Sequence, residues 1–270
     1  HSYGTWTTTK AATCTASGTE RRGCKVCGDA ATHTVPARGH NFGAYRFNGD
    51  AQVNVDGTET ARCSRCSATQ TRTAVGSALA PTVGQTVAAA GATYQATGTA
   101  TVTYAGPSNK KAASVTVPAT VTISGRTYQV TSIAPKAFAG NKALKSVKIG
   151  ANVKSVPANA FKGCTKLASV SFGNGITSIG KNAFSGCKAL KSVTLGTKVT
   201  TIGDGAFQNC AKLTKVTVKS TKLSKIGKNA FAGCKKLGTL TLKTTKLKSI
   251  GKNAFKGTKP RLTVKVPKKK

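Results

Sequence analysis

The sequence has no methionine and few acidic residues, and both shortages limit what the protein can be. Its 270 residues include six Asp and Glu against 42 Lys and Arg, so the formal net charge is +36. Only Asp204 lies beyond residue 80, so a paired-carboxylate hydrolase or a carboxylate-bound Ca²⁺ or Mg²⁺ site has almost no ligands there. The missing methionine predicts that the chain is a piece of a longer protein.

Histidine is also scarce, with three residues that all lie within the first 40 positions. A Ser-His-Asp triad therefore has no histidine in the larger part of the chain. The sequence has no phosphate-binding loop or dinucleotide-binding motif, so we expect no enzymatic activity. No apolar run approaches the ~20 residues of a membrane-spanning helix. A hydrophobic share of 39% is nevertheless enough to build a core.

From residue 130 onward the sequence repeats with a period of 23 or 24 residues. Each unit carries the dipeptide Ala-Phe, then Leu, then two alternating apolar residues. The phenylalanines are Phe138, Phe161, Phe184, Phe207, Phe231 and Phe255. One such unit cannot bury its apolar side, whereas stacked units share a continuous core. The period lies within the ~20–29 residues of leucine-rich repeats.

The pattern within each unit predicts how the chain coils. The run Leu-x-x-Val-x-Leu, as at residues 190–195, predicts a short strand that lies parallel to its neighbours, and Ala-Phe-x-Gly-Cys predicts a turn or short helix. We therefore predict a leucine-rich-repeat solenoid of about six coils over residues 131–270. The cysteine of each unit occupies one register position, where we expect a buried apolar group rather than a metal or redox ladder. These cysteines are Cys164, Cys187, Cys210 and Cys234.

The segment before the repeats has a different pattern. Residues 93–130 alternate between Thr and apolar residues, which is typical of strands. We predict a β cap that covers the first coil and contains a hairpin with Ser124-Gly125 as its turn. Residues 79–92, rich in Ala, Gly, Thr and Val, are predicted to form a linker.

Residues 1–39 and 40–78 are two copies of a small cysteine module, for which we predict loop-rich structure. Each copy begins with a histidine and carries Gly-Thr-Glu before a Cys-x-x-Cys pair. The matching positions are His1, Cys24 and Cys27 in the first copy, and His40, Cys63 and Cys66 in the second. The second copy is degenerate, because Val53 stands where the first has Cys14.

The Cys-x-x-Cys pairs favour a structural zinc ion, because such a turn brings two thiolates within reach of one tetrahedral metal. In the first module we expect Cys14 and a histidine to complete the site of Cys24 and Cys27. The candidate histidines are His1, His33 and His40. The second module has three ligands, so its site is predicted to be incomplete or to borrow one. A disulfide is the alternative for each pair, and for the second module a disulfide or an empty site is favoured.

The surface of the predicted solenoid is polar and strongly basic. Residues 81–270 contain 33 basic residues and one acidic residue, and such a surface attracts polyanions through counterion release. Lys greatly outnumbers Arg, which favours cell-wall polymer or host matrix over sequence-specific nucleic acid. The candidate residues of a binding face are Lys148, Ser171, Thr194, Thr217 and Thr241. The alternative is a sheet surface filled with Thr for its strand propensity alone.

The unit Ile-Gly-x-x-Ala-Phe-x-Gly-Cys-x-x-Leu, as at residues 179–190, resembles the BspA-type leucine-rich repeats of bacterial surface proteins. The resemblance covers roughly residues 130–267, where six units match in register. The cysteine modules look like tandem CxxC modules of some Gram-positive surface proteins. The resemblance implies an extracellular or cell-wall-associated scaffold for adhesion or protein binding, with no ligand carried over. The alternative is a spacer or accessory region of a larger wall-associated protein.

Overall fold

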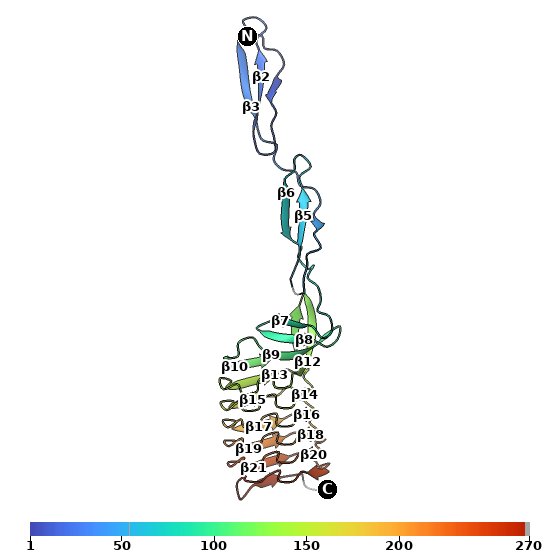
Figure 1. Cartoon of the computed structure of the whole chain (residues 1–270), viewed down its shortest axis with the longest axis vertical. Coiled ribbons are helices and arrows are strands. Elements are labelled where there is room, and N and C mark those ends of the chain that lie inside the picture. Colours follow the sequence, from blue (N-terminus) through green and yellow to red (C-terminus); the bar gives the residue numbers. More distant parts are fainter. Residues whose placement is uncertain (54, 268–270) are drawn as a thin grey trace. The chain divides into compact units, whose positions relative to one another are not determined.

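The computed structural model describes residues 1–53 and 55–267, and strands joined by turns and loops make up its regular structure (Figure 1). The chain divides into two compact units, His1–Leu79 and Ala80–Lys270. Among the described residues, no helix has the length and apolar character that crossing a membrane requires.

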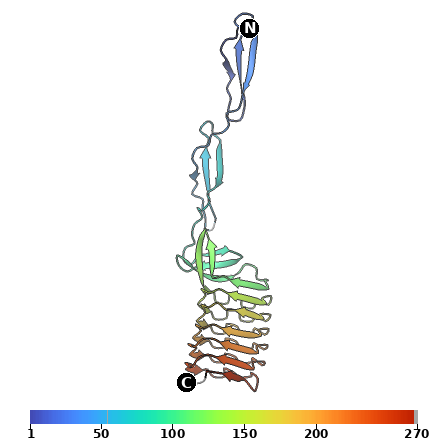
Figure 2. The ribbon, with the colours of Figure 1, turned by 180° about the vertical axis from the view of Figure 1, so that it is seen from behind.

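The larger unit is a solenoid in which every coil contributes one strand to a parallel face (Figure 2). The strands of this face are β10 (Ser114–Val117), β13 (Ser146–Ile149), β15 (Ser169–Ser171), β17 (Ser192–Leu195), β19 (Lys215–Val218), β21 (Thr239–Leu242) and β23 (Thr263–Lys265). They pair in two runs, β10-β13-β15 and β17-β19-β21-β23.

A second parallel ladder consists of two-residue strands, one from each of five coils. These are β14 (Ser155–Val156), β16 (Ser178–Ile179), β18 (Thr201–Ile202), β20 (Lys225–Ile226) and β22 (Ser249–Ile250). Together the two ladders confirm the predicted solenoid of short parallel strands.

One detail of the solenoid differs from the prediction. The parallel face has seven strands among the described residues instead of about six, because Ser114–Val117, which its alternation assigns to the cap, pairs with β13. Of the two predicted alternatives for Ala-Phe-x-Gly-Cys, a turn or a short helix, the described residues form turns. Around Phe184, for example, Asn182 and Gly186 have φ angles of 54° and 77°. These left-handed residues lie four positions apart and interrupt an α-helix, and Asn and Gly adopt this conformation most readily.

A stack of aromatic rings runs through the core of the solenoid. Phe184 lies between Phe161 and Phe207, with ring centroids 5.0 and 5.3 Å apart and planes inclined by 2°. At the cap end, Tyr104 stacks on Phe138 at 5.7 Å. Each ring is therefore packed against the equivalent ring of the neighbouring coil, as the shared register of the repeats requires.

The repeat cysteines lie beside this stack and are fully buried free thiols, as predicted. The Cys187 thiol donates to the carbonyl oxygen of Phe161 in the preceding coil at 3.2 Å, and the other three make the equivalent bond. Burial raises the pKa of Cys164 to about 11. These thiols are neutral members of the core.

The first coil is covered by a five-stranded sheet in the order β11-β12-β9-β8-β7. Its strands are β7 (Thr86–Ala89), β8 (Ala92–Ala96), β9 (Thr101–Pro107), β11 (Thr120–Ile123) and β12 (Arg126–Ile133). The predicted hairpin is confirmed, since β11 and β12 pair antiparallel around Ser124 and Gly125, with φ angles of 51° and 69°. β7 lies within residues 79–92, so the predicted linker contributes an edge strand to the cap.

The smaller unit contains two antiparallel sheets of three strands. The first has β1 (Thr7–Lys10), β2 (Gly18–Gly23) and β3 (Ala30–Val35), and the second has β4 (Arg46–Phe47), β5 (Thr58–Arg62) and β6 (Thr69–Thr73). The buried hydrophobic residues here are Cys14, Cys24, Ala61 and Cys63. An apolar core this small is not enough to hold a fold, and small domains of this kind depend on metals or cross-links.

Candidate metal centres and the basic face

Four potential metal ligands meet in the smaller unit, at the start of the second module. The ligand atoms of Cys14, His40, Cys63 and Cys66 all lie within 4.8 Å of one another, and the group can hold a metal ion. The Sγ atoms of Cys14 and Cys63 are 3.8 Å apart. Two sulfurs on one tetrahedral zinc, each at ~2.3 Å, are about 3.8 Å apart. A disulfide would require about 2.05 Å, so the observed separation fits ligands of a shared ion.

Backbone amides prepare Cys63 to act as a thiolate. The N–H groups of Asn41 and Arg65 both donate to its Sγ atom at 3.4 Å. Burial raises the pKa of Cys63, but these donors, together with His40 and Cys66, outweigh burial and lower the pKa to about 5. His40 Nδ1 lies 3.4 Å from Cys66 Sγ and completes the group. Since the thiolate is the form that binds metal, this turn is organised for a cation.

A second group lies in the first module and has three ligands, His1, Cys24 and Cys27. His1 Nδ1 is 3.0 Å from Cys27 Sγ, and the N–H of Val26 donates to Cys24 Sγ at 3.4 Å. The backbone donors Val26 and Cys27 lower the pKa of Cys24 to about 7. The turn repeats the geometry of the Cys63 turn, but among the described residues no fourth ligand joins it.

The structure groups the ligands differently from the sequence-based assignment. Cys14 and His40, assigned there to the site of Cys24 and Cys27, lie instead with Cys63 and Cys66. The reason is strand β2, because Cys14 precedes it and Cys24 follows it. The strand has six residues that each extend it by ~3.4 Å, so its two ends, and the cysteines beyond them, are about 20 Å apart. Cys14 thus joins the second group and brings it to four potential ligands.

Two other expectations for the modules also differ from the structure. All of the cysteines are free thiols, so of the two alternatives favoured for Cys63 and Cys66, a disulfide or an empty site, the disulfide is not formed. His33 belongs to neither metal group. Its Nε2 lies 3.5 Å from Glu20, and its ring packs edge-on against Trp6 with centroids 4.2 Å apart.

The five residues predicted for a binding face share one row on the solenoid. Lys148 lies opposite Ser171, Thr194 opposite Thr217, and Thr217 opposite Thr241. Their side chains are exposed or half-buried, while the alternate positions of the same strands point into the core. We call these five residues the hydroxyl row, because four of them carry small hydroxyl groups and Lys148 lies at one end.

A line of exposed lysines runs along the turns that follow the cysteine position. In each coil one of these lysines lies one or two residues after the cysteine position, and we call this set the lysine ridge. It consists of Lys142, Lys166, Lys188, Lys212, Lys236 and Lys259. The ion pairs among the described residues lie in the smaller unit, so no described solenoid lysine has an acidic partner. Asp204 accepts a hydrogen bond from the backbone N–H of Lys228 at 2.8 Å.

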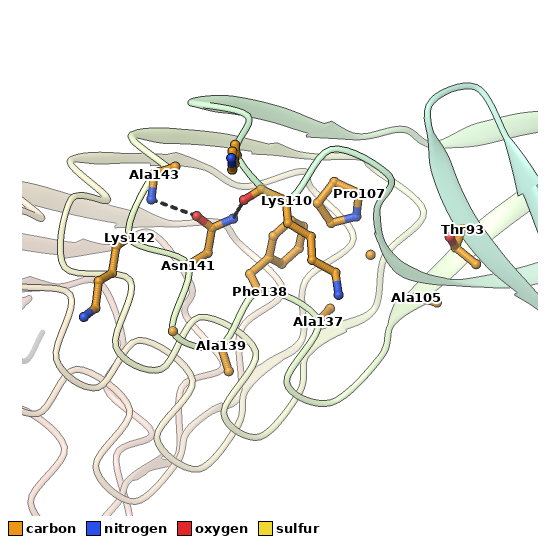
Figure 3. A pocket seen from close by; sticks show the side chains of 13 residues that line it. Thr93, Ala105, Pro107, Lys110, Ala137, Phe138, Ala139, Asn141, Lys142 and Ala143 are labelled. Atoms are coloured by element: carbon orange, nitrogen blue, oxygen red, sulfur yellow. Dashed lines mark hydrogen bonds between the residues drawn. The ribbon is translucent and has the colours of Figure 1, made fainter.

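The first coil and the cap also enclose a hollow of about 710 Å³ (Figure 3). Phe138 and Pro107 line it together with Lys110 and other residues. The Asn141 amide bonds to the backbone, donating to the oxygen of Lys110 at 3.0 Å and accepting from Ala143 at 2.9 Å. The lysine ammonium groups and the Thr93 hydroxyl are therefore the polar side-chain groups left for a ligand, and the positive charges suit an anion.

The repeats match a known family. Residues 131–261 fit the model of the BspA type leucine-rich repeat region in six copies. The solenoid is a BspA-type leucine-rich repeat region. This confirms the resemblance carried by the Ala-Phe-x-Gly-Cys units. The comparison with curated proteins finds no match to this sequence.

Solved structures resemble this chain, with its BspA-type solenoid, in fold. The pneumococcal vaccine antigen PcpA is 24% identical with a TM-score of 0.59, over 70% of this chain and 51% of that one. A leucine-rich cell surface protein from Faecalibacterium prausnitzii A2-165 is 25% identical with a TM-score of 0.52, over 67% of this chain and 54% of that one. The chain therefore spans about half the length of both proteins.

Proposed function

We propose that the protein is a secreted or cell-wall-associated binding scaffold, without catalytic activity, whose basic solenoid engages a polyanionic partner. The observation that carries this proposal is the lysine ridge, with an unpaired ammonium group in every coil that contributes to it. The BspA-type repeats, and the cell surface protein from F. prausnitzii among the similar structures, support a scaffold that binds at a surface.

The spacing of the ridge explains why a polymer is the favoured ligand. Neighbouring coils lie ~4.8 Å apart, so their ammonium groups repeat at a distance comparable to that between charges on a polyanion chain. Each phosphate or sulfate that is neutralised releases a counterion. The logarithm of the affinity therefore falls against the logarithm of the salt concentration, with a slope of ~0.7 per contact for a single polymer chain. The hydroxyl row adds hydrogen-bonding groups on the parallel face, and no member of the row is an aromatic residue that could stack on a base.

Salt-dependent binding tests this proposal. The full chain is passed over immobilised heparin-like and teichoic-acid-like polymers at ~0.1 M salt, with a protein of equal net charge as the reference. We expect stronger retention than the reference, and six contacts predict an affinity loss of roughly 10²–10³-fold between ~50 and ~200 mM salt. Retention equal to the reference would favour the alternative, a spacer that holds another domain away from the wall.

We also propose that the ion held by the N-terminal modules is a structural zinc. One support is the set of three cysteines and one histidine, in which the Sγ atoms of Cys14 and Cys63 are 3.8 Å apart. The other is that the buried apolar residues of this unit are mostly potential metal ligands. Metal analysis of the purified full chain tests this. We expect about one tightly held zinc per chain, and a content under ~0.5 would argue against a structural site.

A further inference from the structure

We propose that the ion bound by Cys14, His40, Cys63 and Cys66 is a clip that fastens the first cysteine module to the second. This inference rests on the proposed metal site, and it adds what that site does. Cys14 belongs to the first module, whereas the other three ligands belong to the second. The ion therefore bonds to two folding modules at once, instead of closing a loop within one of them.

The protein's own contacts at this joint are few and polar. The N–H of Arg38 donates to the carbonyl oxygen of Thr13 at 2.9 Å. The guanidinium of Arg65 donates to the oxygen of Arg38 at 2.7 Å. Both arginines are exposed, and such bonds exchange with water at little net cost. Residues 36–39, which connect the modules, include a proline and a glycine and no buried residue. A bond through the metal is thus the strongest link available between the two sheets.

The repeat itself indicates the same arrangement. The cysteine at module position 14 is present in the first copy, which is followed by another Cys-x-x-Cys turn. In the second copy the position is Val53, and the next cysteine after Cys66 is Cys164 in the solenoid core. The cysteine is therefore present where a neighbouring turn can accept it and absent where none follows.

The clip predicts that metal controls stiffness. When the ion is bound, the two modules move as one body, and when it is removed, the joint at residues 36–39 bends independently. A chelator or an oxidant of Cys14 then changes the reach of this segment without unfolding the solenoid, whose cysteines are buried elsewhere.

The experiment uses the full chain loaded with ¹¹³Cd²⁺, a zinc substitute whose NMR couplings identify its ligands. The test variant is Cys14→Ser, and the matched control is Val53→Ser, which changes the same module position outside either metal group. We expect Cys14 to couple to the same ¹¹³Cd nucleus as Cys63 and Cys66. Cys14→Ser should weaken that site by more than the roughly 10–100-fold that an outer-shell change costs, and Val53→Ser should not.

Stiffness is measured on the same samples by ¹⁵N relaxation of the two modules. Wild type and Val53→Ser with metal should show one shared correlation time for both modules. Cys14→Ser, and wild type after chelation, should show two different ones. Chelation reaches the unclipped state without a mutation, and the amide chemical shifts of β1–β3 and β4–β6 in the same spectra distinguish two separately tumbling folded modules from unfolded ones.

The outcomes separate the clip from the metal site. If ¹¹³Cd²⁺ binds to His40, Cys63 and Cys66 without Cys14, the site survives and the clip is refuted. If Cys14 is a ligand but chelation leaves the shared correlation time unchanged, the clip is again refuted. If no tight binding occurs in any sample, both the zinc proposal and the clip are wrong.

Discussion

The lysine ridge gives the sharpest prediction for function. Replacing Lys142, Lys166, Lys188, Lys212, Lys236 and Lys259 together by Gln removes six ammonium groups and keeps most of each side chain. A matched variant replaces six other exposed lysines, Lys154, Lys162, Lys181, Lys198, Lys225 and Lys252. Both variants lower the net charge of +36 by the same amount, so they differ only in where the charge is lost.

The expected difference follows from counterion release. Six lost contacts reduce the slope of log affinity against log salt by about 4 in the ridge variant, at ~0.7 per contact. The matched variant should lose much less, because its lysines are spread over other surfaces of the coils. Binding of a heparin-like chain is measured by titration calorimetry from ~50 to ~200 mM salt.

Folding is not expected to confound this comparison. The substituted lysines are exposed and have no acidic partner, and surface changes of this kind usually alter stability by less than ~0.5 kcal/mol each. Removing like charges should even stabilise the solenoid slightly at low salt. Equal slopes for the two variants would refute the ridge as the contact surface and leave only diffuse attraction by net charge.

Three further predictions concern the solenoid. Phe184→Ala should cost roughly 3–5 kcal/mol in denaturant unfolding, because its ring is buried between two others, whereas Phe255→Ala in the last coil should cost clearly less. Equal costs would contradict the nearest-neighbour stack. Asn182→Gly should be nearly neutral and Asn182→Ala should cost about 1 kcal/mol, because φ is 54° here and Gly205 fills the same position in the next coil. The reverse order in thermal unfolding would exclude backbone conformation as the reason for Asn. The four repeat cysteines should resist a maleimide in the folded chain and react after unfolding, since they are buried and burial raises the pKa of Cys164 to about 11. Labelling of Cys187 in the native state, detected by mass spectrometry, would show that the coil opens.

The periodic part of the fold can be predicted from sequence because one residue pattern repeats in register. The Phe, Cys and Leu positions of the four units between Phe161 and Leu237 all lie in the core, and the hydroxyl row from Lys148 to Thr241 lies on one face. The turn conformation was harder to predict. A short run such as Ala-Phe-x-Gly-Cys suits a helix or a turn, and the left-handed backbone at Asn182 decides between them.

The metal groups show why the rest could not be predicted. Sequence proximity assigns Cys14 to Cys24, ten residues away, whereas strand β2 carries the two cysteines to opposite ends of the module. The sequence predicts loop-rich structure where Gly18–Gly23 forms this strand between the two cysteines. The consequence of the strand appears only once the start of the second module is placed beside the loop that holds Cys14. A ligand set that crosses a module boundary is not visible in either copy alone.

The ring stack has a consequence for how such a protein lengthens. Each inner phenylalanine, from Phe161 to Phe231, packs on the equivalent ring of the coils before and after it, so the inner coils present the same surface above and below. A duplicated 23-residue segment can therefore enter between two coils and find a matching neighbour on both sides. It adds one ring, one strand and one ridge lysine, and extends the parallel face by ~4.8 Å. Gene duplication can thus adjust the number of charges offered to a polymer in whole steps, without redesigning the core.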